Sequence, residues 1–132
     1  MSRSARTGRG PPARERGSVS VVATGVIAVI VVLALASSDV ARVLATVSRA
    51  QTAADSAALA AAQELAVPSG GETPEEAAAR YASRNGAQML SCSCSTSERE
   101  AVVEVRVAVG ALLLFGSGRA VTARARAVVD QP

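Results

Sequence analysis

A long apolar segment near the N-terminus is the clearest feature of the hydrophobic pattern. Residues 17–38 contain no charged side chain and are dominated by Val, Ile, Leu and Ala. As a helix, these 22 residues would measure about 33 Å, which matches the roughly 30 Å hydrocarbon core of a bilayer. The pattern therefore predicts a transmembrane helix over residues 17–38.

Two other interpretations of this segment stay open. Ala34-Leu35-Ala36 has the small-x-small form that signal peptidase uses, so cleavage after Ala36 would release a small secreted extracellular protein. Against this, the apolar run is longer than the core of a usual signal peptide. The segment is alternatively a buried helix of a soluble core, although the arginines directly before it argue against that reading.

The helical pattern continues beyond the apolar segment. Residues 39–67 contain neither Gly nor Pro and are rich in Ala, so we expect one helix from about Ser18 to Val67. Apolar residues recur there at alternating spacings of four and three and form one stripe, interrupted by Gln51. The stripe comprises Val40, Leu44, Val47, Ala54, Ala58, Ala61 and Leu65. Its small side chains allow close packing, either with the protein's own domain or with other subunits.

Residues 68–132 predict a small domain that begins with a second helix. Residues 68–71, Pro-Ser-Gly-Gly, end the first helix. Thr73 is the expected N-cap of the next one, with Pro at the first helical position and Glu76 placed to complete a capping box. Asn85-Gly86 is the expected end of this helix.

Beyond Gly86 the pattern changes to a period of two, which is typical of strands. Residues 88–94, 103–109 and 121–127 predict three strands joined as a meander. The apolar segment 110–116 is too short to span a bilayer, and we expect it to cover the sheet or to contact the membrane. The predicted fold class is α+β, pilin-like, with a long N-terminal helix, a short second helix and a three-stranded antiparallel meander.

Charge is distributed unevenly along the chain. All 14 basic residues are Arg, and five of them lie in residues 1–17 with one acid, whereas the rest of the chain holds nine Arg and ten acids. We expect residues 1–16 to be a disordered tail that stays in the cytoplasm, since basic flanks remain on that side. Residues 39–67 and 68–132 are then extracytoplasmic. Binding of the tail to nucleic acid is the less favoured alternative.

The sequence offers no recognisable catalytic or metal-binding set. It has neither His nor Lys, so a serine nucleophile would lack its usual bases. Glu75 and Glu76 fit the first turn of a helix, where the macrodipole favours acids. We therefore expect a non-enzymatic membrane protein without cofactor, metal, nucleic acid or small-molecule substrate.

The two cysteines, Cys92 and Cys94, are separated by one residue. On a strand they share a face with Cα atoms roughly 6.5–7 Å apart, at the outer limit of disulfide geometry. A disulfide within the chain, a cross-link between subunits, and two small buried side chains are the open alternatives.

Three stretches, taken in order, resemble the N-terminal module of TadE/TadG-like proteins of the tight-adherence (Flp) pilus and secretion machinery. They are residues 16–21 (Arg-Gly-Ser-Val-Ser-Val), residues 39–42 (Asp-Val-Ala-Arg) and residues 51–62, which begin Gln-Thr-Ala-Ala-Asp. Ser91-Cys92 and residues 123–127 are similar to small actinobacterial members. The resemblance implies a single-pass structural component of a pilus or secretion apparatus that acts by helix packing with partner subunits, including copies of itself.

The resemblance also implies a processing site. A prepilin peptidase cuts TadE-type pseudopilins after a glycine, and a glutamate occupies the fifth position of the mature chain. Here Gly17 and Ser18 would flank the cut, but the fifth position is Val22. TadG-like proteins commonly lack this glutamate, so Gly17 is alternatively an ordinary flexible junction before the membrane segment.

Overall fold

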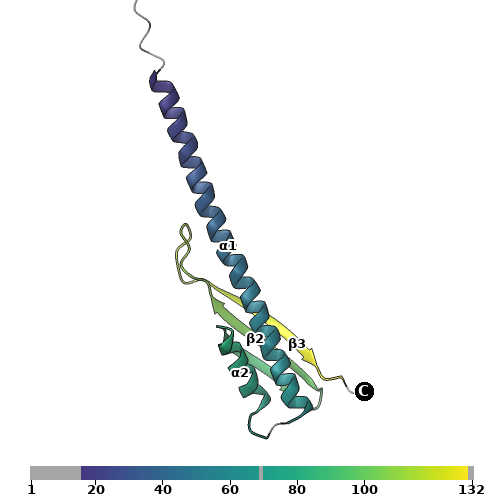
Figure 1. Ribbon diagram of the computed structural model, residues 1–132. Coiled ribbons are helices and arrows are strands. Elements are labelled where there is room, and N and C mark those ends of the chain that lie inside the picture. The colour runs from purple at the N-terminus through teal and green to yellow at the C-terminus, as the bar shows by residue number, and fades with distance from the viewer. Residues whose placement is uncertain (1–15, 69, 131–132) are drawn as a thin grey trace, which may run out of the picture. The chain divides into compact units, whose positions relative to one another are not determined.

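The computed structural model describes residues 16–68 and 70–130 (Figure 1). These residues form helix α1 (Arg16–Ala66), helix α2 (Pro74–Arg84) and strands β1 (Gln88–Ser95), β2 (Glu100–Ala108) and β3 (Ala120–Val128). The predicted α+β class and the predicted order of elements are confirmed. The predicted cytoplasmic tail lies outside the described residues, apart from Arg16. The chain divides into two compact units, of which the second begins at Ala36.

The described part of the first unit is helical and presents apolar side chains. Residues 19–34 are all exposed, and most of them are Val, Ile, Leu and Ala. Within the described residues, α1 is the one helix long and apolar enough to cross a membrane. An apolar surface of this extent is unfavourable in water, which is why such helices are found in lipid.

In the second unit, α1 contributes an alanine face to the core. Six alanines that recur at spacings of three and one are fully buried, and their spacing places them on a single face of the helix. They are Ala50, Ala53, Ala54, Ala57, Ala58 and Ala61. They form one hydrophobic cluster with buried residues of β2, including Val103 and Val105, and with Ala78 and Ala82 of α2. The helices thus cover one face of the sheet (Figure 1).

The sheet is the predicted antiparallel meander, in the order β1-β2-β3. In β2, Ala101, Val103, Val105 and Val107 are buried and the alternate residues are not. The opposite face of the sheet is polar, and Glu104 pairs there in register with Arg124 of β3. One face of the sheet therefore packs on the helices, as the period of two requires.

The ends of α2 follow the predicted capping signals. The hydroxyl of Thr73 accepts the N–H of Glu76 at 3.2 Å, and the Glu76 carboxylate accepts the N–H of Thr73 at 2.8 Å. This is the complete capping box. At the other end Asn85 is the C-cap, and Gly86 follows it with a φ of +71°, a value that glycine adopts without a steric penalty.

Candidate functional site

The loop between β2 and β3, residues 109–119, folds back on itself beside α1. The Leu112 N–H donates to the Gly116 carbonyl at 2.8 Å, and the Val109 N–H donates to the Arg119 carbonyl at the same distance. Gly116 adopts a φ of +75°, which closes this turn. The loop contains the apolar segment 110–116, which lies next to α1. This segment does not cover the sheet, whose buried face packs against the helices.

Two polar residues of α1 hold this loop. The Asp39 carboxylate accepts the backbone N–H groups of Leu113 and Leu114, each at 2.8 Å. One helical turn further on, Arg42 donates from Nη1 to the Ala111 carbonyl at 2.7 Å. Residues three apart lie on the same face of a helix, so the Asp39–Arg42 pair faces the loop together.

Asp39 is charged although its side chain is almost completely covered, with 1% of the residue exposed. Burial by itself would raise the pKa of this carboxyl group. The backbone N–H groups of Leu114 and Leu113, together with the charge of Arg42, outweigh burial and hold the pKa below its usual value. The loop is therefore bound through charge-assisted hydrogen bonds, which are stronger than neutral ones.

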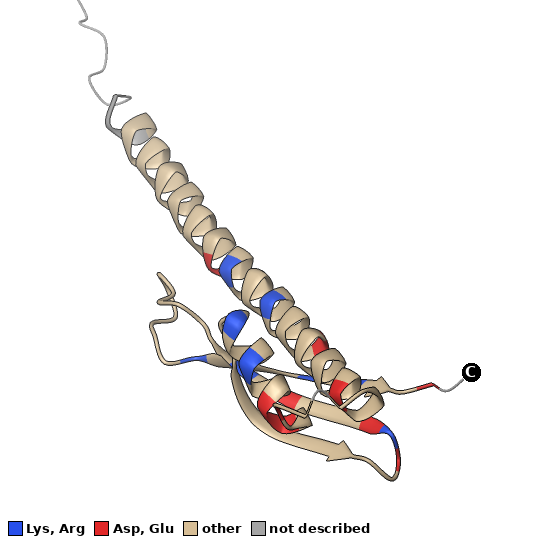
Figure 2. Cartoon of the chain, turned by 60° about the horizontal axis from the view of Figure 1, so that its bottom comes forward, with Lys and Arg blue, Asp and Glu red and all other residues tan. Residues whose placement is uncertain are grey.

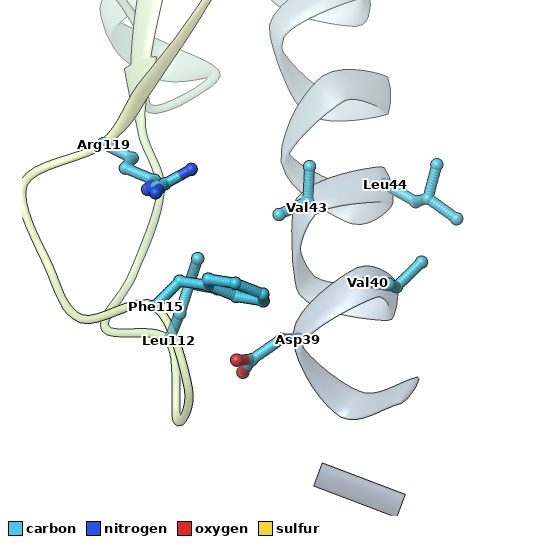
Figure 3. A pocket seen from close by; sticks show the side chains of 7 residues that line it. All are labelled: Asp39, Val40, Val43, Leu44, Leu112, Phe115 and Arg119. Carbon is cyan, nitrogen blue, oxygen red and sulfur yellow. The ribbon is translucent and has the colours of Figure 1, made fainter. Parts of the chain in front are cut away.

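A mostly apolar pocket of about 240 Å³ lies between the loop and α1. Its lining residues are Asp39, Val40, Val43, Leu44, Leu112, Phe115 and Arg119 (Figure 3). The Phe115 ring points from the loop toward the helix, and the Arg119 guanidinium lies 5.7 Å from the ring centroid. The pocket is smaller than usual small-molecule sites and its wall is aliphatic and aromatic, so it suits an apolar side chain of a partner.

The predicted stripe on α1 divides into two environments. Ala54, Ala58 and Ala61 are buried in the core, and Leu65 is half-buried against it. The other three members, Val40, Leu44 and Val47, are exposed, and we refer to them as the uncovered stripe. The alanines thus pack on the protein's own domain, whereas the uncovered stripe is accessible to another molecule.

The remaining predicted site residues lie apart from the loop. Gly17 and Ser18 are in the first turn of α1, and their side chains are outside the described set. Cys92 and Cys94 on β1 are joined as a disulfide with Cα atoms 5.6 Å apart, closer than the separation expected for a regular strand. Both cysteines pack against the hydrophobic core. Across residues 16–68 and 70–130, no three His, Cys, Asp or Glu side chains are placed to hold a metal ion.

Sequence reasoning missed the partners of the Asp39–Arg42 pair. The motif was recognised from its resemblance to a family, but the loop that it binds follows about 70 residues later. The one signal in the sequence was an unusually apolar segment, 110–116, within an otherwise alternating pattern. No local rule links such a segment to a particular turn of a distant helix.

Part of α1 matches a known protein family. Residues 17–64 match the Tad family, described as putative Flp pilus-assembly TadE/G-like, which confirms the predicted resemblance over these residues. Comparison with curated proteins and with solved structures gave no match. The family match and the apolar helix support a pilus-related membrane component. They also suggest membrane anchoring and a structural rather than an enzymatic role.

Proposed function

Because the Tad match falls on α1, we propose that this chain is a membrane-anchored structural component of a tight-adherence (Flp) pilus or a related secretion apparatus. It acts by packing α1 against partner subunits, which include further copies of the chain. The observation that carries the proposal is that the matched helix keeps an apolar surface that the protein's own domain leaves uncovered.

The uncovered stripe is the proposed contact. Val40, Leu44 and Val47 recur at spacings of four and three, so they form a continuous line on the helix. Leu44 is 63% exposed and also lines the apolar pocket. Full burial of such side chains contributes roughly 1.5–3 kcal/mol each, which is enough for a helix-to-helix contact between subunits already confined to the same membrane.

Membrane anchoring follows from the first unit of the chain. Its exposed apolar helix suits lipid, and the five arginines in residues 1–17 favour a cytoplasmic N-terminus with the α+β domain outside. Helix α1 continues through Ala34, Leu35 and Ala36 without a break. The uncharged apolar run of residues 17–38 is longer than the roughly 7–15-residue core of a usual signal peptide, which supports retention of the anchor over release by cleavage after Ala36.

The interface is tested by crosslinking in cells. A photoreactive amino acid at Leu44 is expected to give discrete adducts with other subunits. The same probe at Val128 is the control, because that residue is 59% exposed and lies at the end of β3. Leu44→Arg should remove the adducts formed by a probe at Val40 while the chain stays in the membrane fraction. Equal labelling at Val128, or none at Val40, Leu44 and Val47, would contradict the proposed interface.

The anchor is tested by the N-terminal sequence and intact mass of the chain in membrane and culture fractions. A membrane-bound chain that begins at Met1 or Ser18 is the expected result. Ser18 would in addition show cleavage after Gly17 despite Val22. A soluble chain that begins at Ser37 would overturn the anchor and establish a secreted protein.

A further inference from the structure

The tip of the β2–β3 loop carries large apolar side chains that stay exposed beside α1. Leu113, Leu114 and Phe115 are consecutive and exposed, and Phe115 has 59% of its surface accessible. Residues 107–118 carry no charged side chain. The charges beside the tip are the buried Asp39 carboxylate and the Arg119 guanidinium. A continuous apolar tip of this kind is typical of a surface that meets another apolar phase.

The position of the loop tip along α1 points to the lipid bilayer as that apolar phase. Asp39, which binds the N–H groups of Leu113 and Leu114, directly follows the last residue of the uncharged segment. At a rise of 1.5 Å per residue, Asp39 therefore lies within about 2 Å, along the helix, of the end of the predicted span. The polar headgroup layer is roughly 5–7 Å deep on each side of the hydrocarbon core. If residues 17–38 span the bilayer, a loop bound at Asp39 lies near the level of the headgroups.

The charged residues of the domain also bear on a membrane contact. Arg42 and Arg119 flank the loop, and the Asp39 carboxylate between them is buried. At the far end of the domain, where the turn after β1 lies near the end of α1, Arg99 is accompanied by the acids Glu98, Glu100 and Asp130. Figure 2 shows most of the acidic residues away from the loop, with basic residues present at both ends of the domain. Arginines beside the loop are attracted to anionic headgroups, and at the far end the excess of acids is not.

We propose that the β2–β3 loop is a second membrane contact, in which Leu113, Leu114 and Phe115 enter the bilayer interface and Arg42 and Arg119 meet anionic lipid headgroups. The Asp39–Arg42 pair positions the loop for this contact. The loop then holds the domain against the membrane surface. The uncovered stripe therefore lies at a fixed distance above that surface. The proposal needs the membrane span but no partner subunit, so it stands independently of the function in a pilus.

The chain contains no Trp, so one introduced tryptophan reports on a single position. Phe115→Trp places it on the loop tip. Val128→Trp is the matched control, because Val128 and Phe115 are equally exposed and Val128 pairs with Glu100 at the far end of β3. The full chain is inserted into phosphatidylcholine–phosphatidylglycerol vesicles at low density, and only floated vesicles are measured. Lipids brominated near the top of their acyl chains quench tryptophan that enters the interface, where interfacial segments lie about 5–10 Å deep.

The Phe115→Trp chain is expected to lose most of its fluorescence to brominated lipid, whereas the Val128→Trp chain keeps it. Adding Arg119→Gln to Phe115→Trp should reduce the quenching in anionic vesicles more than in pure phosphatidylcholine. Weak and equal quenching of both tryptophans would overturn the proposal. A second result would also overturn it: the loop tryptophan is never quenched by brominated lipid and is protected from aqueous acrylamide only at high chain density. That result would mean that the tip contacts a second copy of the chain.

Discussion

Ala58→Leu tests whether the alanine face of α1 belongs to the protein's own core. Ala58 has 1% of its surface exposed and belongs to the cluster that includes Val103 and Val105. The substitution adds three carbon atoms where the neighbours are already in contact. Overpacking of this kind costs about 1–3 kcal/mol. For a domain of 60–100 residues, a loss of about 2 kcal/mol lowers the melting temperature by roughly 8–16 °C.

The assay needs a signal from the sheet, because the apolar half of α1 stays helical in detergent when the domain unfolds. Hydrogen exchange of peptides from β2, read by mass spectrometry on the full chain in micelles, gives that signal. Ala58→Leu should make β2 amides exchange faster, since they exchange through unfolding of the domain. Ala41→Leu is the matched control: it makes the same change on the same helix at an exposed alanine.

The reasoning would be refuted if Ala58→Leu left exchange in β2 and the melting temperature at the values of Ala41→Leu. The alanine face would then be free in the single chain. In that case, the alternative drawn from the sequence, that the whole stripe packs against other subunits, would apply to Ala54, Ala58 and Ala61 as well. Loss of assembly together with an unchanged fold would establish it.

Two further predictions concern α2 and acid pH. Thr73→Ala removes the hydroxyl that accepts the Glu76 N–H and should lower stability by about 1 kcal/mol, measured by thermal melting against Ser83→Ala, whose exposed hydroxyl bonds only within its helix. The Arg80 hydrogen bond holds the pKa of Glu72 below its usual value. At Asp39 burial acts in the opposite direction, but the Leu114 and Leu113 N–H groups lower the pKa overall. A carboxyl group whose pKa is lower in the folded protein than in the unfolded chain stabilises the folded protein above the unfolded pKa of about 4. This stabilisation is lost as the pH falls through the pKa of the folded protein. Melting temperatures should therefore fall below about pH 4, and Glu72→Gln should weaken that dependence.

Most of the fold could be predicted because its signals are local. The capping box of Thr73 and Glu76, the stop at Asn85-Gly86 and the alternation in β2 each depend on residues a few positions apart. Residues 39–67 contain neither Gly nor Pro and are rich in Ala, which was enough to predict that α1 continues beyond the membrane segment. Local propensity and hydrophobic period agreed at each of these places, and such agreement is what makes a prediction dependable.

The candidate site could be predicted only in part, because it is made by contacts between distant segments. Periodicity places Val40 and Ala58 on one predicted stripe, but it cannot tell which members the sheet will cover. That outcome depends on where β2 meets α1, and the sheet reaches the alanines and not the uncovered stripe. Likewise, the sequence indicates only that Asp39 is the first charged residue after the membrane segment. Its two N–H partners come from a loop about 75 residues away.

The division of α1 has a consequence for assembly. If a filament required the alanine face for packing between subunits, the domain would first have to leave α1 and expose Val103 and Val105, which are fully buried. Each exposed valine would cost roughly 1.5–3 kcal/mol, and the alanine face would lose its own burial as well. The uncovered stripe and the membrane segment need no such rearrangement. Assembly should therefore proceed with the domain docked on α1, through a surface that begins where the helix leaves the bilayer and ends where the sheet begins to cover it.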